Sequence, residues 1–169
     1  MKRKLFLWEI SGFIFTAVFG TLLHFLYEWS GENKIVSTFS AVNESTWEHL
    51  KLLFFPTLVF SVIQYFVIGH DFKGFLFTKA IATLLGMLTI ITLFYTYKGV
   101  VGKNFLIVDI IIFLAGVAVV AIFSYFRLPH GKGNNLLGAF IFIIIAILFA
   151  LFTFNPPPIG LFQQPNSQQ

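Results

Sequence analysis

Histidine and carboxylate side chains gather in one stretch of a chain that otherwise has few charged residues. The stretch NESTWEHLK, residues 43–51, contains Glu44, Glu48 and His49. Carboxylates and imidazoles bind divalent metal ions, and a carboxylate beside an imidazole also performs acid–base chemistry. Because the chain contains no cysteine, a mixed nitrogen and oxygen ligand set favours Zn, Mn or Fe as the cofactor.

Three further ionisable residues lie inside apolar segments elsewhere in the chain. His24 and Glu28 are four residues apart, a spacing that places both on one face of a helix. Asp109 lies five residues into a later apolar segment. We therefore predict metal ligands among His24, Glu28, Glu48, His49 and Asp109, and catalytic residues among Glu44, Glu48 and His49.

The composition indicates that a lipid bilayer surrounds these residues. The chain has 169 residues, of which 57% are apolar, only 11% are charged and 24 are phenylalanine. Soluble domains contain about 25% charged residues, and a soluble fold of this size has no surface for so many apolar side chains. The net charge of +4 does not indicate nucleic-acid binding, because no basic face interleaved with aromatic residues is present.

Five apolar segments are each close to the ~20 residues with which a helix crosses a bilayer. They do not alternate as barrel strands do, so the predicted fold is an all-α integral membrane helical bundle. The predicted spans are residues 5–29, 50–69, 74–95, 105–126 and 136–154. They form one transmembrane domain over residues 1–155, followed by a Pro/Gln-rich tail over residues 156–169.

The lysines and arginines predict how the bundle is oriented. With the N-terminus inside, seven basic residues flank the inner ends of the spans and four flank the outer ends. Cytoplasmic loops carry an excess of Lys and Arg, which favours an N-in/C-out orientation. The candidate site residues then share one level on the outer side of the membrane.

Each candidate residue also has a purely structural interpretation. Ser45 and Glu48 have the spacing of a capping box, in which both side chains satisfy backbone groups at a helix start. His24 and Glu28 have the spacing of a hydrogen-bonded pair along one helix. A carboxylate near a helix start, as at Asp109, is stabilised by the helix dipole. Glu44 and His49 lie where side chains are solvated at the headgroup level.

Four functions remain open at this stage. The first is an outward-facing polar pocket that binds a divalent metal or a small-molecule ligand, and the second is a membrane-embedded hydrolase acting on a lipid or lipid-linked substrate. The third is a transporter subunit, and the fourth is a structural or assembly protein. Glu9 is expected to pair with the basic N-terminus. The inner halves of the second to fifth spans contain almost no ionisable groups apart from Lys79, which lies near an end of its span. This argues against an ion relay.

Residues 22–56 resemble a family of small bacterial multi-pass membrane proteins of unknown function, and VNESTWEHLKL, residues 42–52, is the most specific part. The ending NPPPIGLF, residues 155–162, is also similar to that family. The last residues read QQPNSQQ, where the family usually has an acidic, glycine-containing ending. The resemblance implies a bacterial inner membrane and no established activity. The residues that fall on the family signature are His24, Tyr27, Glu28, Asn43, Glu44, Trp47, Glu48 and His49.

Overall fold

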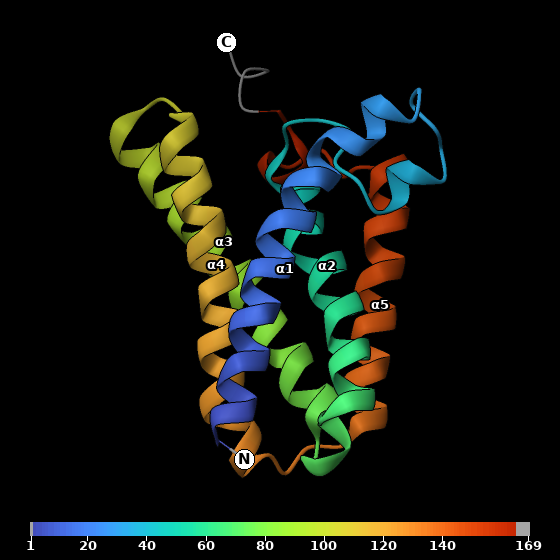
Figure 1. Ribbon diagram of the computed structural model, residues 1–169. Coiled ribbons are helices and arrows are strands. Elements are labelled where there is room, and N and C mark those ends of the chain that lie inside the picture. The colour runs from blue at the N-terminus through green and yellow to red at the C-terminus, as the bar shows by residue number, and fades with distance from the viewer. Residues whose placement is uncertain (1, 165–169) are drawn as a thin grey trace.

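Five long helices joined by short connections make up the computed structural model, which describes residues 2–164. No strand is present in this part of the chain, and the predicted all-α fold is confirmed. Figure 1 shows the helices running along one common direction as a single bundle. They are α1 (Lys2–Trp29), α2 (Thr46–Val67), α3 (Phe75–Val101), α4 (Leu106–Arg127) and α5 (Asn135–Phe154).

Two helix boundaries differ from the predicted spans for local reasons. α2 begins four residues earlier than predicted, because Ser45 caps it by accepting a hydrogen bond from the Glu48 backbone N–H. α3 continues past Tyr95 to Val101 and ends at Gly102, whose φ of 76° is a left-handed helix-ending conformation. Tyr97 therefore lies inside α3.

Small residues set how closely the helices pack. A side chain on Gly86 of α3 would lie 2.8 Å from the Gly116 carbonyl oxygen of α4, so these two backbones touch directly. α1 packs against both α2 and α4, while α3 also packs against α2 and α5. The most buried apolar side chains, such as Leu53, Phe54 and Phe149, lie where α2, α3 and α5 meet.

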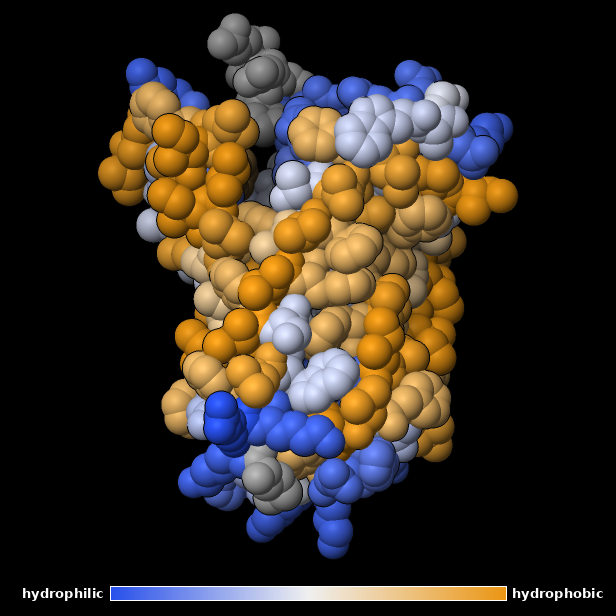
Figure 2. Space-filling view, viewed as in Figure 1, coloured by the Kyte–Doolittle hydropathy of each residue, from blue (hydrophilic) through white to orange (hydrophobic). Residues whose placement is uncertain are grey.

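The bundle has two chemically distinct ends. The N-terminal end holds the start of α1 and the two short connections that include 3-10 helices at Gly69–Asp71 and Leu128–His130. The opposite end, called the loop end here, holds the segment 30–45 with its 3-10 helix Val36–Thr38. Figure 2 shows hydrophilic residues at both ends and an apolar belt between them. All five helices are long and apolar enough to span a membrane; the N-in/C-out orientation stays a prediction.

At the loop end, the α3–α4 hairpin leans away from the other helices (Figure 1). Figure 2 shows the surface hollowed between this hairpin and the segment 30–45. The 3-10 helix Gly160–Phe162 of the predicted tail returns to the bundle, where the Phe162 ring lies 4.8 Å from the Trp47 ring. Residues 165–169 of that tail lie outside the described residues.

Candidate metal centre

Three helices meet at Gly20 of α1, and this junction forms the floor of the candidate site. A Cβ at Gly20 would collide with the Leu52 carbonyl oxygen of α2 and would come within 2.8 Å of the Phe113 ring of α4. Only glycine permits this approach, so α1, α2 and α4 are held together at this level. The position along each helix is thereby fixed relative to the other two.

One helical turn from this junction toward the loop end, each helix carries a candidate ligand. His24 follows Gly20 by four residues, and His49 precedes Leu52 by three. Asp109 precedes Phe113 by four residues on α4, which runs in the opposite direction to α1. A turn rises about 5.4 Å, so the common floor brings residues far apart in the sequence to one level.

The segment 30–45 contributes the fourth residue, Glu44, and side-chain hydrogen bonds hold its backbone. Ser40 accepts from the Tyr27 N–H at 3.0 Å and donates to the Leu23 carbonyl, which joins the segment to α1 beside His24. Asn43 Oδ1 accepts from the Ser45 N–H at 2.8 Å, which forms a turn just before α2. Glu44 is therefore placed between the last turns of α1 and the first turn of α2.

His24, Glu44 and His49 form a cluster with metal-ligand geometry. His49 Nε2 is 3.4 Å from Glu44 Oε2, and His24 Nε2 is 3.7 Å from Glu44 Oε1. One ligand atom from each residue lies within 4.8 Å of the others. Two ligands of a tetrahedral metal at 2.0–2.1 Å are about 3.3–3.4 Å apart, so the observed separations need little adjustment. Glu44 is 65% exposed, which leaves the cluster accessible from the loop end.

The hydrogen bonding of His49 leaves its other ring nitrogen facing the carboxylate. Nδ1 lies 2.9 Å from the Ser45 carbonyl oxygen, and because a carbonyl only accepts, Nδ1 carries the hydrogen. Without a second proton, the lone pair on Nε2 would face an oxygen of Glu44. Either a proton on Nε2 or a bound cation removes this repulsion. A backbone carbonyl that orients a histidine in this way is also a usual partner of a metal-ligating imidazole.

The electrostatics of Glu44 favour its ionised form. The hydrogen bond with the His49 side chain lowers the pKa of the Glu44 carboxyl below its ordinary value, partly opposed by burial, and the charges of His49 and His24 contribute further. An ionised carboxylate is the form that coordinates a metal. Glu44 is thus ready to act as a ligand at neutral pH.

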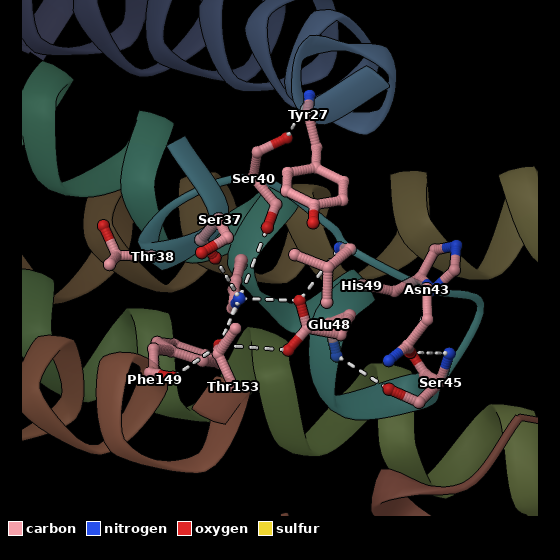
Figure 3. A network of polar contacts seen from close by, with 12 residues as sticks. Tyr27, Ser37, Thr38, Ser40, Asn43, Ser45, Glu48, His49, Phe149 and Thr153 are labelled. Atoms are coloured by element: carbon pink, nitrogen blue, oxygen red, sulfur yellow. Dashed lines mark hydrogen bonds and ion pairs between the residues drawn. The ribbon is translucent and has the colours of Figure 1, made fainter. Parts of the chain in front are cut away.

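Glu48, predicted both as ligand and as catalytic residue, belongs to a different network. Its carboxylate is 2.6 Å from Lys51 Nζ and accepts from Thr153 of α5 at 3.2 Å. Figure 3 shows Glu48 directed toward Thr153, while the His49 ring points away from this network. Glu48 also accepts from the Val42 N–H at 3.1 Å. The Ser45 half of the predicted capping box is confirmed, but Glu48 reaches back to Val42 and not to the cap residue.

The remaining predicted ligands have separate positions. Glu28 is exposed, and the structure gives no ion pair between it and His24 among residues 2–164. Asp109 interacts electrostatically with His49 and Glu44, and its Oδ1 is buried without a hydrogen-bond partner among the described residues. Asp109 therefore borders the three-residue cluster, while the exposed Glu28 interacts with His24 through its charge and forms no ion pair with it among the described residues.

Two buried lysines were missed as site-forming residues. Lys51, one of the four basic residues counted at the predicted outer ends of the spans, is fully buried. Its spacing of three residues from Glu48 is the sequence signal that indicated a pair. The expectation that Glu9 pairs with the basic N-terminus is wrong, because Glu9 binds Lys79 of α3 at 2.7 Å. Glu9 and Lys79 both lie inside the half of the bundle near its N-terminal end, where their ion pair offsets the free-energy cost of burying two charges.

A family model matches residues 2–169 of the chain. The chain belongs to DUF6512, a family of unknown function. No curated protein and no solved structure matches it. Membership in DUF6512 therefore confirms the expected family without supplying an activity, and the function is argued from the cluster itself.

Proposed function

We propose that this protein binds a divalent metal ion through His24, Glu44 and His49 in a site at the outer face of a bacterial inner membrane. The observation that supports the proposal is the approach of three ligand atoms from α1, the segment 30–45 and α2 to within 4.8 Å. Two imidazoles, one carboxylate and no thiolate suit Zn, Mn or Fe.

Three protein ligands leave coordination positions for water or a substrate. The cluster is accessible from the loop end through the exposed Glu44. A structural metal would instead have four protein ligands and a closed site. The proposal is therefore a site at which a small ligand reaches the metal, and not a metal that only holds the fold together.

The test measures metal affinity of the full-length protein in detergent or nanodiscs. Isothermal titration and thermal shift with ZnCl₂, MnCl₂ and anaerobic Fe²⁺ are expected to show one metal per chain. His49→Ala and Glu44→Gln should each weaken binding at least about tenfold, as loss of even a supporting partner does. His70→Ala, which removes an exposed histidine at the N-terminal end, is the matched control and should bind normally.

Two results of these measurements would contradict the proposed metal site. Elemental analysis of purified protein without metal, together with no thermal shift from any of the three ions, would contradict the metal site. Equal affinity in wild type, His49→Ala and Glu44→Gln would place any bound ion elsewhere.

A hydrolase is the second candidate, and Asp109 is the observation that favours it. Its carboxylate borders the cluster and has an unpartnered oxygen among the described residues, which suits a base for a metal-bound water. The hollow beside the α3–α4 hairpin (Figure 2) offers a lipid or lipid-linked substrate a route to this level. Asp109→Asn should then keep metal affinity within about threefold but abolish hydrolysis of ester or phosphoester lipids.

A further inference from the structure

A second polar cluster lies toward the N-terminal end of the bundle, where α1, α2 and α3 meet. Lys79 Nζ is 2.8 and 2.7 Å from the two carboxylate oxygens of Glu9. Gln64 of α2 donates to Glu9 at 2.9 Å. The Glu9 and Lys79 side chains are each only 4% exposed. Lys79 is the one ion-pair partner of Glu9 among residues 2–164.

A cavity of about 20 Å³ borders this ion pair. Its polar lining comes from Glu9, Thr16, Thr57, Ser61 and Lys79. The hydroxyls of Thr16 and Thr57 are 3.4 Å apart, and Ser61 Oγ is buried with no hydrogen-bond partner in the described part of the chain. A buried water needs roughly 10–15 Å³ and two to four polar partners, so the cavity meets both requirements for one water molecule.

The cavity is aligned with the candidate metal centre along α1. Glu9, Thr16, Gly20 and His24 follow one another at spacings of seven, four and four residues, which keeps them on one helix face. Between Thr16 and His24 this face carries only Gly20, where the Leu52 carbonyl and the Phe113 ring make contact. Thr16 and His24 are eight residues apart, so the cavity and the candidate metal centre are separated by about 12 Å along α1, with the Gly20 contact between them.

An apolar cluster packs across the N-terminal end of the bundle on the other side of the cavity. It consists of the buried side chains of Leu5, Ile68, Phe72, Phe75 and Leu128. The ion pair and its cavity therefore lie between the Gly20 contact and this apolar cluster.

Stability alone gives little reason to place this ion pair in the bundle. Replacing a buried ion pair with apolar residues of similar volume is often neutral or stabilising. Ionisable residues inside a membrane bundle that line a hydrated space are typical of proton pathways. The unpartnered Ser61 hydroxyl and the two threonine hydroxyls offer hydrogen-bonding groups to a water molecule in the cavity.

We propose that the cavity beside Glu9 and Lys79 is a hydrated proton-exchange site, through which protons move when a divalent cation binds at the loop end. The cation part of this inference rests on the proposed function. In the exchange, a hydronium ion gives its proton to a Glu9 carboxylate oxygen and becomes water. The Lys79 ammonium then releases one proton to water on the other side. Transfer of the Glu9 proton to the Lys79 amine restores the ion pair, so one proton has crossed with no other bond changed.

Full-length protein in liposomes that contain a trapped pH-sensitive dye tests the exchange. The outside is set at a lower pH than the interior, and valinomycin with potassium dissipates charge. Addition of MnCl₂ outside should then acidify the interior well above the rate in protein-free liposomes. Ser61→Val, which fills the cavity and keeps the ion pair, should slow this change at least tenfold. Glu9→Leu/Lys79→Met removes the proton-exchanging groups and should abolish it. Glu32→Gln alters an exposed carboxylate at the loop end and is the control.

Parallel Mn²⁺ titrations separate the two proposals. Normal Mn²⁺ binding without a pH change in wild type, or equal rates in wild type, Ser61→Val and the double variant, overturns the proton site while the metal site stands. If wild type binds none of Zn²⁺, Mn²⁺ and Fe²⁺, the metal site and its coupling fail. Proton entry driven by a potassium diffusion potential then tests the proton-exchange site without any metal. Entry that is present in wild type and lost in Glu9→Leu/Lys79→Met supports the site. Entry into wild-type liposomes no faster than into protein-free liposomes overturns it.

Discussion

Each end of the bundle buries one lysine–glutamate pair, and the two pairs have opposite surroundings. Lys51 and Glu48 lie on one helix, and four oxygen atoms surround the Lys51 ammonium: those of Thr153 at 2.5 Å, Glu48 at 2.6 Å, and the Ser37 and Ser40 carbonyls at 2.8 and 3.3 Å. Lys79 and Glu9 join two helices and border a cavity. An ion pair whose hydrogen-bonding groups all have partners holds structural elements together. An ion pair beside a polar cavity is also able to bind a water molecule or exchange a proton.

The loop-end pair therefore has a structural role that bears on the candidate metal centre. Its partners are the segment 30–45, α2 and α5, and the Glu48 carboxylate also holds the Val42 N–H two residues before Glu44. This network fixes the backbone from which Glu44 reaches the two histidines. The metal-ligand geometry depends on a lysine that touches none of the ligands.

Removal of the Lys51 ammonium should produce the largest loss of stability. Lys51→Met leaves the Glu48 carboxylate buried without its opposite charge and two loop carbonyls without their donor, and breaking a buried ion pair in this way costs about 3–5 kcal/mol. Thermal unfolding in detergent, followed by circular dichroism, measures the change. Lys98→Met near the end of α3 changes a lysine that is only partly buried, so it is the comparison and should change little. Equal stability of both variants would contradict a structural role for Lys51.

Apolar replacement of both partners should distinguish the two pairs. Glu9→Leu/Lys79→Met is expected to cost about 1–3 kcal/mol, because it removes both charges together and leaves one buried donor, the Gln64 amide, without its partner. Glu48→Leu/Lys51→Met should be less stable, because the Val42 N–H and the Ser37 and Ser40 carbonyls lose their partners at roughly 1–3 kcal/mol for each group left unsatisfied. The unfolding midpoints of the two double variants, compared in one detergent, provide the measurement. A lower unfolding midpoint for Glu9→Leu/Lys79→Met than for Glu48→Leu/Lys51→Met would contradict this difference between the two pairs.

Threonine hydroxyls offer a gentler comparison of the same two regions. Thr153→Val deletes a hydroxyl that accepts from Lys51 and lies beside Glu48, and hydrogen bonds to charged groups are worth about 1.5–3 kcal/mol. Thr57→Val deletes a hydroxyl whose one side-chain hydrogen bond within residues 2–164, with Thr16, is 3.4 Å long. It should cost at most about 1 kcal/mol. Thermal unfolding of the two matched variants tests whether the loop-end network is the tighter one.

Acidification should have the smallest effect, through Glu44 at the exposed side of the loop end. Because the contact with His49 lowers the pKa of Glu44, its ionised form stabilises the fold above the ordinary carboxyl pKa of about 4.3. That stabilisation is lost as the pH falls through the lowered folded-state value. An exposed pair of this kind contributes about 0–1 kcal/mol. Unfolding midpoints of wild type and Glu44→Gln should therefore differ slightly at pH 6 and converge near pH 3; a gap that widens on acidification would show the opposite sign.

Much of the fold was predictable, because a bilayer allows few solutions for an apolar segment. Hydropathy and length predicted five helices, and the apolar segments are those observed. The errors lie at boundaries where a cap or a glycine decides, as at Ser45 and Gly102. Local chemistry also predicted that Ser45 would cap α2, since its hydroxyl is three residues from the N–H that it accepts.

The partners within the candidate site were not predictable to the same degree. His24, Glu44 and His49 were all identified from the sequence, yet Glu48 was grouped with them although it is adjacent to His49. Neighbouring residues on a helix point about 100° apart, so Glu48 faces α5 while His49 faces α1. The face of α2 that meets α1 and the face that meets α5 are set by the packing at Gly20 and by the position of α5. The spacing of residues along α2 indicates neither of these.

The sequence alone thus determined the apolar surroundings of the helices and their number. It also determined which ionisable side chains need a partner in those surroundings. These properties depend on composition and on short-range spacing. Tertiary structure alone decided the pairings: Lys51 with Thr153 across 102 positions, Lys79 with Glu9 across 70, and two histidines around Glu44. The physical reason is that an ionised group in a low-dielectric bundle binds whichever partner the helix packing brings within about 3 Å, whatever its distance along the chain.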